Sequence, residues 1–215
     1  MAEGAVTESN DPETFHRVLG RAVATFEDAG IPFVVFGSVA VGIYGRPGPS
    51  GDIDLLIRPA DRSRALAALD GAGFRVDETD QTWISKAFLE GVMVDLIVQV
   101  RGDLFLDDDM LHRARRVEIH GNQVPLVSPE DAVLIEAASN APEIESHWYQ
   151  AVSIVVGTEL DWAYLMSRAR LAPRRVLSLL VYADADDIEV PRDAIRALYE
   201  RVYSDEPSDS IASSR

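Results

Sequence analysis

Cysteine is absent from this chain of 215 residues, lysine occurs once, and no long hydrophobic run is present. Without cysteine, disulfide bonds and zinc sites with thiolate ligands are excluded. The first residues lack a basic segment followed by an apolar core, and no apolar run approaches the length that crosses a bilayer. We therefore expect a cytoplasmic protein that does not span a membrane.

Positive charge is also scarce, because 20 lysine and arginine residues face 36 aspartate and glutamate residues and leave a net charge of −16. This balance argues against a broad nonspecific grip on nucleic acid, and it suits a basic partner such as an antitoxin or a cationic small molecule. Two arginine-rich segments are candidates for local contact with RNA, although arginine at helix ends also complements the helix dipole. They comprise Arg113, Arg115 and Arg116, and Arg168, Arg170, Arg174 and Arg175.

Several common catalytic motifs are missing. The chain has no phosphate-binding loop of the Gly-x-x-x-x-Gly-Lys-Ser/Thr type, no His-Glu-x-x-His pair and no Gly-x-Ser-x-Gly elbow. With 47% hydrophobic residues the chain can still bury a substantial core. The histidines show no metal-ligand spacing, and we expect ordinary structural or surface roles for them: His16, His112, His120 and His147.

Acidic residues interrupt two apolar segments that have the composition of strands. Asp52 and Asp54 stand two residues apart in the run 52–57, and Asp95 stands in the run 91–98. Because side chains alternate faces along a strand, the first two carboxylates point the same way, and the residue between them faces the core. An antiparallel or neighbouring pairing of the two strands could bring Asp95 beside them.

Three carboxylates in one place favour a divalent cation, since like charges close together raise each other's pKa. Hard oxygen ligands without cysteine or paired histidine favour Mg²⁺ or Mn²⁺. Magnesium commonly binds one or two protein carboxylates together with substrate phosphates. A nucleoside triphosphate (NTP) is therefore the expected second ligand of the metal.

These motifs resemble the DNA polymerase β-like nucleotidyltransferase superfamily in their order. That order is Gly37-Ser38, a short helix, a turn at residues 46–50, Asp52-Ile53-Asp54 and a later Val94-Asp95-Leu96-Ile97. The resemblance covers about residues 15 to 140. It implies an α/β (α+β) fold in which helices flank a mixed sheet. It also implies an enzyme that transfers a nucleoside monophosphate from an NTP such as ATP to a hydroxyl group, with release of pyrophosphate.

The resemblance also implies roles for individual residues. Gly37 and Ser38 would open a helix whose backbone N–H groups hold the triphosphate, in agreement with the anion affinity of helix N-termini. Asp52 and Asp54 would hold the metal ions, and Asp95 would bind the catalytic metal and help to deprotonate the incoming hydroxyl. Without the resemblance, Gly37 could merely end a strand and Ser38 could merely cap the helix that follows.

Two basic residues stand near these motifs. Lys86, the single lysine, lies on an apolar face of the predicted strand 82–88, where it could reach the triphosphate or simply extend to water at a sheet edge. We include it among the candidate nucleotide-binding residues. Arg46 lies in the loop before the aspartates and is a candidate phosphate contact, although loop arginines are more often solvated.

The pattern of helices and strands predicts four parts. They are a flexible tail at residues 1–10, a nucleotidyltransferase catalytic domain at 11–127, a helical region at 128–203 and a second flexible tail at 204–215. Within the catalytic domain, besides the strand of Asp52, we expect strands at 32–36, 74–76, 82–88 and 92–98, and helices at 39–44 and 62–69 after a first long helix.

Local signals predict several boundaries of these elements. Asp11 is the expected cap of the first helix, with Pro12 in its first turn. Gly121-Asn122 is the expected turn of a hairpin. Ser128 and Thr158 are expected caps of two later helices.

Residues 124–169 also resemble helical regions of bacterial AbiE-type and related transfer-RNA-modifying nucleotidyltransferase toxins. Such toxins often have lysine in the helix after a Ser-Pro-Glu-Asp turn and aspartate in the next helix. This chain has Glu136 and Gln150 near those places, and Glu136 would repel a phosphate that lysine binds. The resemblance implies a toxin–antitoxin system, with a cognate antitoxin as partner and transfer RNA as acceptor, and the two substitutions depart from that pattern.

The acceptor stays open on the sequence alone. The alternatives are transfer RNA, a small molecule such as an aminoglycoside, a protein that receives AMP, and a non-catalytic module that binds nucleotide or a partner on the same fold. Arginines facing the cleft would favour RNA, whereas a deep acidic pocket would favour a cationic small molecule.

Overall fold

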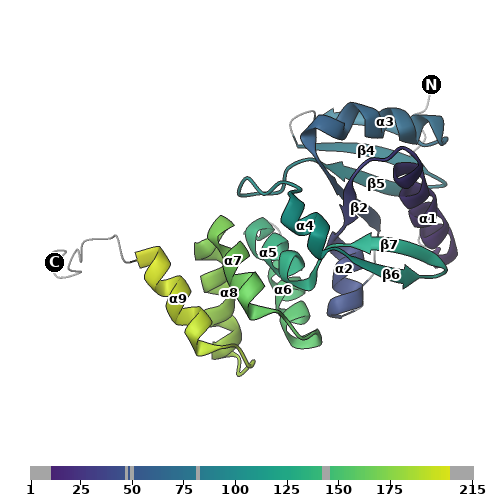
Figure 1. Cartoon of the computed structure of the whole chain (residues 1–215). Coiled ribbons are helices and arrows are strands. Elements are labelled where there is room, and N and C mark those ends of the chain that lie inside the picture. The colour runs from purple at the N-terminus through teal and green to yellow at the C-terminus, as the bar shows by residue number, and fades with distance from the viewer. Residues whose placement is uncertain (1–10, 47, 49–50, 81–82, 142–145, 204–215) are drawn as a thin grey trace, which may run out of the picture.

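The chain forms a mixed sheet with helices packed on it, followed by a group of helices beside the sheet (Figure 1). This is the α/β architecture that the sequence predicts. The computed structural model describes residues 11–46, 48, 51–80, 83–141 and 146–203. The tails predicted at 1–10 and 204–215 therefore lie outside the described residues.

Seven strands of the described residues form one sheet in the order β3-β4-β5-β2-β1-β7-β6. Neighbours β2 and β5, and β1 and β7, are parallel, whereas the other neighbouring pairs are antiparallel. The central position of β2 and β5 brings the two acidic segments of the sequence side by side. The strands are β1 Phe33–Val35, β2 Asp52–Ile57, β3 Arg75–Asp80, β4 Ile84–Leu89, β5 Val92–Ile97, β6 Arg115–Ile119 and β7 Asn122–Leu126.

Helices cover the sheet and continue beyond it. They are α1 Pro12–Asp28, α2 Gly37–Tyr44, α3 Arg62–Gly71, α4 Asp108–Arg113, α5 Pro129–Ser139, α6 Ser146–Gly157, α7 Trp162–Arg168, α8 Pro173–Ala185 and α9 Arg192–Tyr203, with short 3-10 turns at Pro59–Asp61 and Ala169–Leu171. Helices α1 and α3 contact each other and pack against the sheet, while α2 contacts β2 as well as α5 and α6. Helices α5 to α9 gather on one side of the sheet in Figure 1, so α2 lies between the sheet and this helical region.

The first helix follows its sequence signals. Asp11 is its N-cap and accepts a hydrogen bond from the backbone N–H of Thr14 at 3.0 Å, and Pro12 lies in its first turn. Ser128 likewise caps α5, as predicted, and accepts from the N–H of Asp131 at 3.1 Å. The buried face of α1 consists of Phe15, Val18, Leu19, Ala22, Val23 and Phe26, which share helical spacing in the sequence.

Two local predictions need correction, and one helix was missed. The hairpin turns at His120-Gly121, where φ is 47° and 82°, and Asn122 already belongs to β7. A two-residue turn of this kind needs positive φ at both central positions, and the pair before Asn122 supplies it. Helix α7 is capped by Asp161, which accepts from the N–H of Tyr164, and not by Thr158. Helix α4 was not predicted, because its 6 residues are too few to show a helical period.

A buried ion network fastens the helical region to the segment that leads into α4. Arg168 is 1% exposed, and its guanidinium donates to Asp131 at 2.8 Å and to Asp107 at 2.7 Å. Asp131 also accepts from the hydroxyls of Tyr164 and Ser128. Because a buried guanidinium depends on such partners, Arg168 has a structural role. The prediction that Arg168 contacts RNA is therefore wrong.

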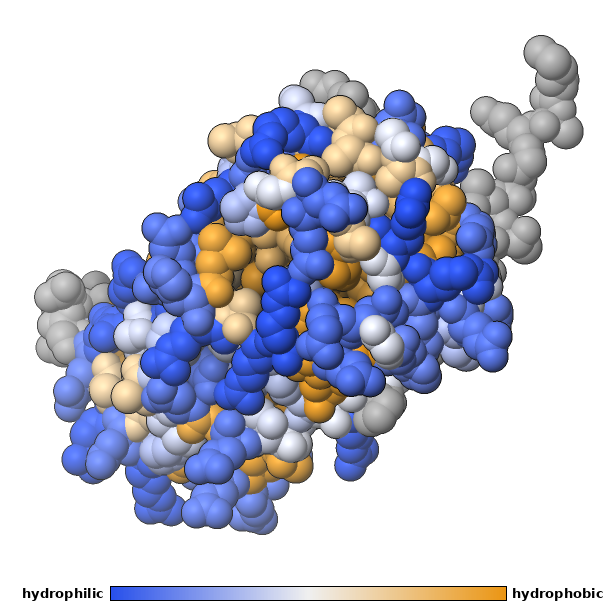
Figure 2. Space-filling model, turned by 45° about the vertical axis from the view of Figure 1, so that its right-hand side comes forward, coloured by the Kyte–Doolittle hydropathy of each residue, from blue (hydrophilic) through white to orange (hydrophobic). Residues whose placement is uncertain are grey.

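The face of the molecule shown in Figure 2 is mostly hydrophilic. On the face shown in Figure 2, hydrophobic residues reach the surface mainly in hollows between hydrophilic ones. Among the helices of the described residues, none is both long and apolar enough to cross a membrane.

Candidate active site

Three carboxylates meet near the centre of the sheet. The parallel pairing of β2 with β5 sets Asp54 opposite Asp95, and Asp52 lies on the same face two residues before Asp54. One oxygen from each of the three carboxylates lies within 4.8 Å of the other two. Ile53 and Leu55 are fully buried on the opposite face. The neighbouring pairing considered from the sequence is therefore present, in its parallel form.

Negative charge accumulates around Asp54. Burial raises the pKa of its carboxyl well above the ordinary value, the charges of Asp52, Asp95 and Glu136 raise it further, and the Lys86 ammonium lowers it. Such a cluster is stable when a cation compensates its charge. Three carboxylate ligands without sulfur or imidazole fit Mg²⁺ or Mn²⁺, because both ions prefer oxygen donors.

Lys86 brings one compensating charge from the protein itself. It lies on β4 opposite Asp95 of β5, and its Nζ donates to the two carboxylate oxygens at 2.9 and 3.1 Å. Its Nζ also lies 3.2 Å from the sulfur of Met93. Because β4 has neighbours on both sides, the lysine does not extend to water at a sheet edge. The position of the ammonium shows that this part of the acidic cluster can accommodate a cation.

Helix α2 begins directly beside Asp54. Its first residue, Gly37, has φ of 58°, a conformation that favours glycine, and a Cβ at this position would lie 2.0 Å from Oδ2 of Asp54. The backbone N–H of Phe36 donates to the carbonyl of Asp54 at 3.1 Å. Glycine is therefore required both by the backbone and by the close approach of the carboxylate. The helix predicted at 39–44 starts two residues earlier, at Gly37.

The N-terminus of α2 has the properties of an anion site. Phe36 occupies the N-cap position and offers no side-chain cap. Ser38 lies inside the first turn, and its hydroxyl donates to the carbonyl of Asp52 at 3.5 Å, so it does not cap the helix as the alternative from the sequence supposed. The first N–H groups of a helix lack partners within the helix and attract negative charge. Here they adjoin the carboxylate cluster.

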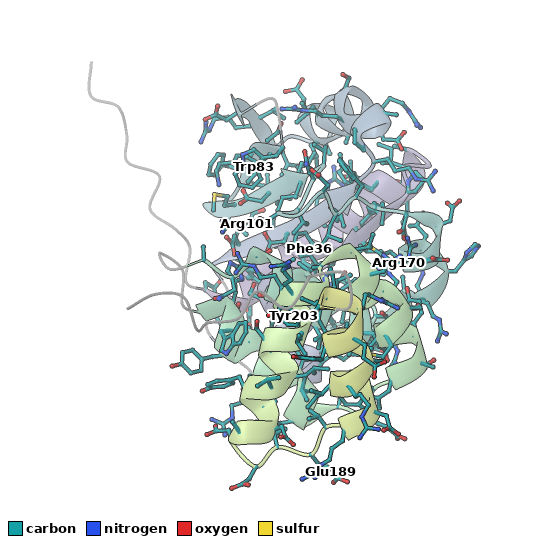
Figure 3. The ribbon with its side chains drawn as sticks, turned by 90° about the vertical axis from the view of Figure 1, so that its left-hand side faces the viewer. Phe36, Trp83, Arg101, Arg170, Glu189 and Tyr203 are labelled. Carbon is teal, nitrogen blue, oxygen red and sulfur yellow. The ribbon has the colours of Figure 1, made fainter. Side chains whose placement is uncertain are left out.

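A cleft of about 530 Å³ opens between the acidic cluster and the helical region. Gly37 and Asp54 contribute to its wall, and much of the remaining lining is apolar. Figure 3 shows three of its other lining residues, Trp83, Arg101 and Phe36, above the helices. Trp83 is 44% exposed. A largely apolar cleft with a few polar groups is typical of small-molecule sites.

Glu136 and His147 form a polar pair in the same cleft. Glu136 lies on α5 and is 3% exposed, and its Oε2 lies 2.6 Å from Nδ1 of His147 near the start of α6. Sequence reasoning gave His147 no functional role, because the pairing depends on how α6 packs against α5 and has no recognisable spacing. Gln150, the other departure from the toxin pattern, is not among the described residues that line the cleft.

The other candidate arginines are engaged or exposed elsewhere. Arg113 and Arg116 form ion pairs with acidic side chains of other elements, and Arg175 donates to a backbone carbonyl. Arg46 is exposed on the surface. Among the described residues that line the cleft, Arg101 is the single arginine. The structure therefore does not gather the two arginine-rich segments at the cleft.

Comparison with known protein families assigns this chain to one of them. A family model described as "Uncharacterised nucleotidyltransferase" matches residues 7–183. The chain belongs to this nucleotidyltransferase family. The matched residues include the carboxylate cluster and helices α5 to α7, so the family model also covers much of the helical region. No curated protein sequence matches this nucleotidyltransferase.

Several solved structures resemble the enzyme. The antibiotic-resistance factor ANT(2'')-Ia has a TM-score of 0.51 and 14% identity, over 90% of this chain and 97% of its own. The lincosamide antibiotic adenylyltransferase LnuA has a TM-score of 0.47 and 14% identity, over 67% of this chain and 98% of its own. The Thermotoga maritima protein TM1012 has a TM-score of 0.46 and 19% identity, over 57% and 83%. The likeness to ANT(2'')-Ia supports the nucleotidyltransferase fold.

Proposed function

We propose that this nucleotidyltransferase transfers a nucleoside monophosphate from an NTP to a hydroxyl group at a divalent metal site formed by Asp52, Asp54 and Asp95. The observation that carries the proposal is the meeting of these carboxylates beside the N-terminus of α2. Bound Mg²⁺ or Mn²⁺ would supply charge that stabilises the entering and leaving oxygens of the reacting phosphate. The products are the nucleotidylated acceptor and pyrophosphate.

The groups around the metal ligands have separate tasks in this proposal. Backbone N–H groups at Gly37 and Ser38 hold the triphosphate, because the first turn of a helix attracts anions. Lys86 is a nucleotide-binding residue as well. A metal ion bound by Asp95 competes with the Lys86 ammonium, and the triphosphate then offers the lysine a new partner of opposite charge.

A small molecule with a hydroxyl group is the acceptor that the cleft fits best. Its volume of about 530 Å³ is in the range of small-molecule sites. Besides the proposed metal ligand Asp54, its lining includes the carboxylate of Glu136, which suits an acceptor that carries positive charge, such as an aminoglycoside. The structural neighbour ANT(2'')-Ia is an antibiotic-resistance factor, which is compatible with this class of acceptor.

Transfer RNA is a second candidate, as in a toxin that has a cognate antitoxin. It is favoured by Arg101 and the exposed Trp83, both of which line the cleft. Arginine and aromatic side chains together bind unstacked bases of single-stranded nucleic acid. The net charge of −16 and the engagement of Arg113, Arg116 and Arg168 elsewhere weigh against it.

Label transfer from α-³²P-NTPs identifies the acceptor. Each NTP is incubated with Mg²⁺ or Mn²⁺ and either a set of hydroxylated amines that includes aminoglycosides or total transfer RNA. We expect labelled small molecules with the wild type and with the control Asp70→Asn, an exposed carboxylate of α3, and none with Asp54→Asn. Label on transfer RNA alone would reject the small-molecule acceptor in favour of the second candidate. Labelling of the enzyme itself would indicate a protein acceptor.

A further inference from the structure

The carboxylate that the polymerase β-like pattern assigns to proton removal, Asp95, is paired with Lys86. Both oxygens of Asp95 accept hydrogen bonds from Lys86, at 2.9 and 3.1 Å, and one oxygen of the same carboxylate belongs to the candidate metal site. A general base needs a free lone pair directed at the proton that it removes. The cleft contains a second group with that property.

Glu136 determines which nitrogen of His147 is free. Nδ1 of His147 lies 2.6 Å from Oε2 of Glu136, and an ionised carboxylate at this place can only accept, which makes Nδ1 the donor. In the neutral imidazole with this hydrogen bond, Nε2 has the lone pair. The His147 side chain is 27% exposed and lines the cleft, and the Glu136 side chain beside it is 4% exposed. This arrangement is that of a histidine base held by a buried carboxylate.

The pair also stands close to the reacting centre. Glu136, His147 and Asp54 line one cleft of about 530 Å³, together with Gly37 at the start of α2. An acceptor in this cleft would lie beside both Asp54, one of the proposed metal ligands, and His147. Neither Asp52 nor Asp95 is among the described residues that line this cleft, whereas the imidazole of His147 is, so the histidine faces an acceptor bound there.

We infer that His147 is the general base for the acceptor hydroxyl and that Glu136 is its positioning residue. The inference rests on the proposed function. The hydroxyl proton passes to Nε2 of His147, and the acceptor oxygen forms a bond to the α-phosphorus. The bond from the α-phosphorus to the bridging oxygen breaks, and that oxygen leaves with pyrophosphate. The imidazolium that results is stabilised by the carboxylate of Glu136 and returns its proton to solvent.

Transfer kinetics test the catalytic role of His147. The variants are His147→Ala, Glu136→Gln and the control Tyr149→Phe, which is exposed on the same helix. Product formation from α-³²P-ATP is measured with the acceptor from the label screen or, if none is labelled, with water, which yields AMP. We expect His147→Ala to slow transfer about 10²- to 10⁴-fold, and added imidazole to restore part of the rate. Glu136→Gln should slow it about 10- to 100-fold.

Calorimetry with Mg²⁺ and ATP separates this role from a structural one. We expect His147→Ala and Tyr149→Phe to bind the nucleotide as the wild type does, and Tyr149→Phe to keep the wild-type rate. A rate for His147→Ala within about threefold of the wild type would overturn the inference. So would a slow variant that imidazole does not rescue, because the pair would then only join α5 to α6.

Nitrogen NMR of histidine-labelled protein gives a readout that does not depend on activity. We expect Nδ1 of His147 to be protonated and Nε2 to be unprotonated, with the resonances assigned by their loss in His147→Gln. A proton on Nε2 would overturn the inference even if the enzyme is active. Failure of the proposed function shows differently, as a wild type that neither binds Mg²⁺ and ATP nor transfers label.

Discussion

Lys86 donates hydrogen bonds to both oxygens of Asp95, so the single lysine of the chain is paired with one of the three carboxylates of the proposed metal site. The ammonium and a divalent cation therefore compete for the same charge. We expect Lys86→Gln to bind Mn²⁺ about tenfold more tightly than the wild type when no nucleotide is present, because one opposing positive charge is gone. Affinity for the NTP should fall in the same variant.

Electron paramagnetic resonance of free Mn²⁺, with and without a non-hydrolysable NTP, measures both effects of Lys86→Gln. Arg21→Gln, a change of an exposed cation on α1, is the matched control. Unchanged affinity for both ligands would contradict the assignment of Lys86 to the nucleotide site.

Gly37 and Gly42 differ in what a methyl group would meet, although both belong to α2. A Cβ at Gly37 would lie 2.0 Å from Oδ2 of Asp54 on a backbone with φ of 58°, whereas a Cβ at Gly42 meets no atom within 4 Å. We expect Gly37→Ala to lower the free energy of unfolding by about 1–2 kcal/mol or more and to abolish transfer. Gly42→Ala should raise that free energy by up to about 1 kcal/mol and keep activity. Urea unfolding measures the stability of both variants, and label transfer measures their activity. Equal stability and activity of the two variants would contradict the requirement for glycine at position 37.

Asp54 combines a catalytic requirement with a cost in stability. Its carboxyl is buried beside three other acidic groups, which raises its pKa, so its charge disfavours the metal-free folded state. We expect Asp54→Asn to unfold at higher urea concentration than the wild type when metal is chelated, and to lose more than about 100-fold in transfer rate. Asp70→Asn, at an exposed position of α3, should change neither property. A destabilised Asp54→Asn would show that the carboxylate has a structural role instead.

Arg168 is predicted to matter for stability and not for contact with RNA. Arg168→Met leaves Asp131 buried without its charged partner, and we expect a loss of about 3–5 kcal/mol in the free energy of unfolding. Arg170→Met, at an exposed position two residues away, should stay within about 0.5 kcal/mol of the wild type. Equilibrium urea unfolding measures both values. A loss below about 1 kcal/mol for Arg168→Met would show that the network is not the link between the regions.

The stacked rings of His16 and His120 predict a dependence of stability on pH. Their centroids are 3.6 Å apart, and burial, followed by the charge of His120, lowers the pKa of His16 below 6.5. As the pH falls through about 6.5, the unfolded His16 binds a proton before the folded one does, so the free energy of unfolding decreases. We expect His16→Gln to weaken this decrease. In an NMR titration, His120→Gln should raise the pKa of His16, and an unchanged pKa would contradict the account.

Much of the fold was readable from the sequence because the signals are local. The apolar face of α1 has helical spacing, and Asp11 and Ser128 are strong cap residues in front of their helices. Asp52 and Asp54 share a face because a strand alternates, which holds in any sheet order. The hairpin turn was placed one residue late, since Gly121 can occupy either central position and the sequence does not say which neighbour joins it.

The parts of the site that the sequence did not predict depend on tertiary contacts. The parallel register that sets Asp95 opposite Asp54, and Lys86 opposite Asp95, arises from the order of the strands in the sheet. The pairing of Glu136 with His147 arises from packing between two helices. No spacing in the sequence encodes these distances, so the histidine was assigned an ordinary role.

Metal dependence of nucleotidyl transfer tests the central claim most directly. Transfer of label from α-³²P-NTP to the acceptor is measured in protein freed of metal by chelation, then with Mg²⁺ or Mn²⁺ added back, for the wild type and for Asp52→Asn, Asp54→Asn and Asp95→Asn. We predict transfer by the wild type only after metal is restored, and a loss of more than about 100-fold in each variant. Transfer that persists without metal, or at the wild-type rate in these variants, would contradict the assignment of the three carboxylates.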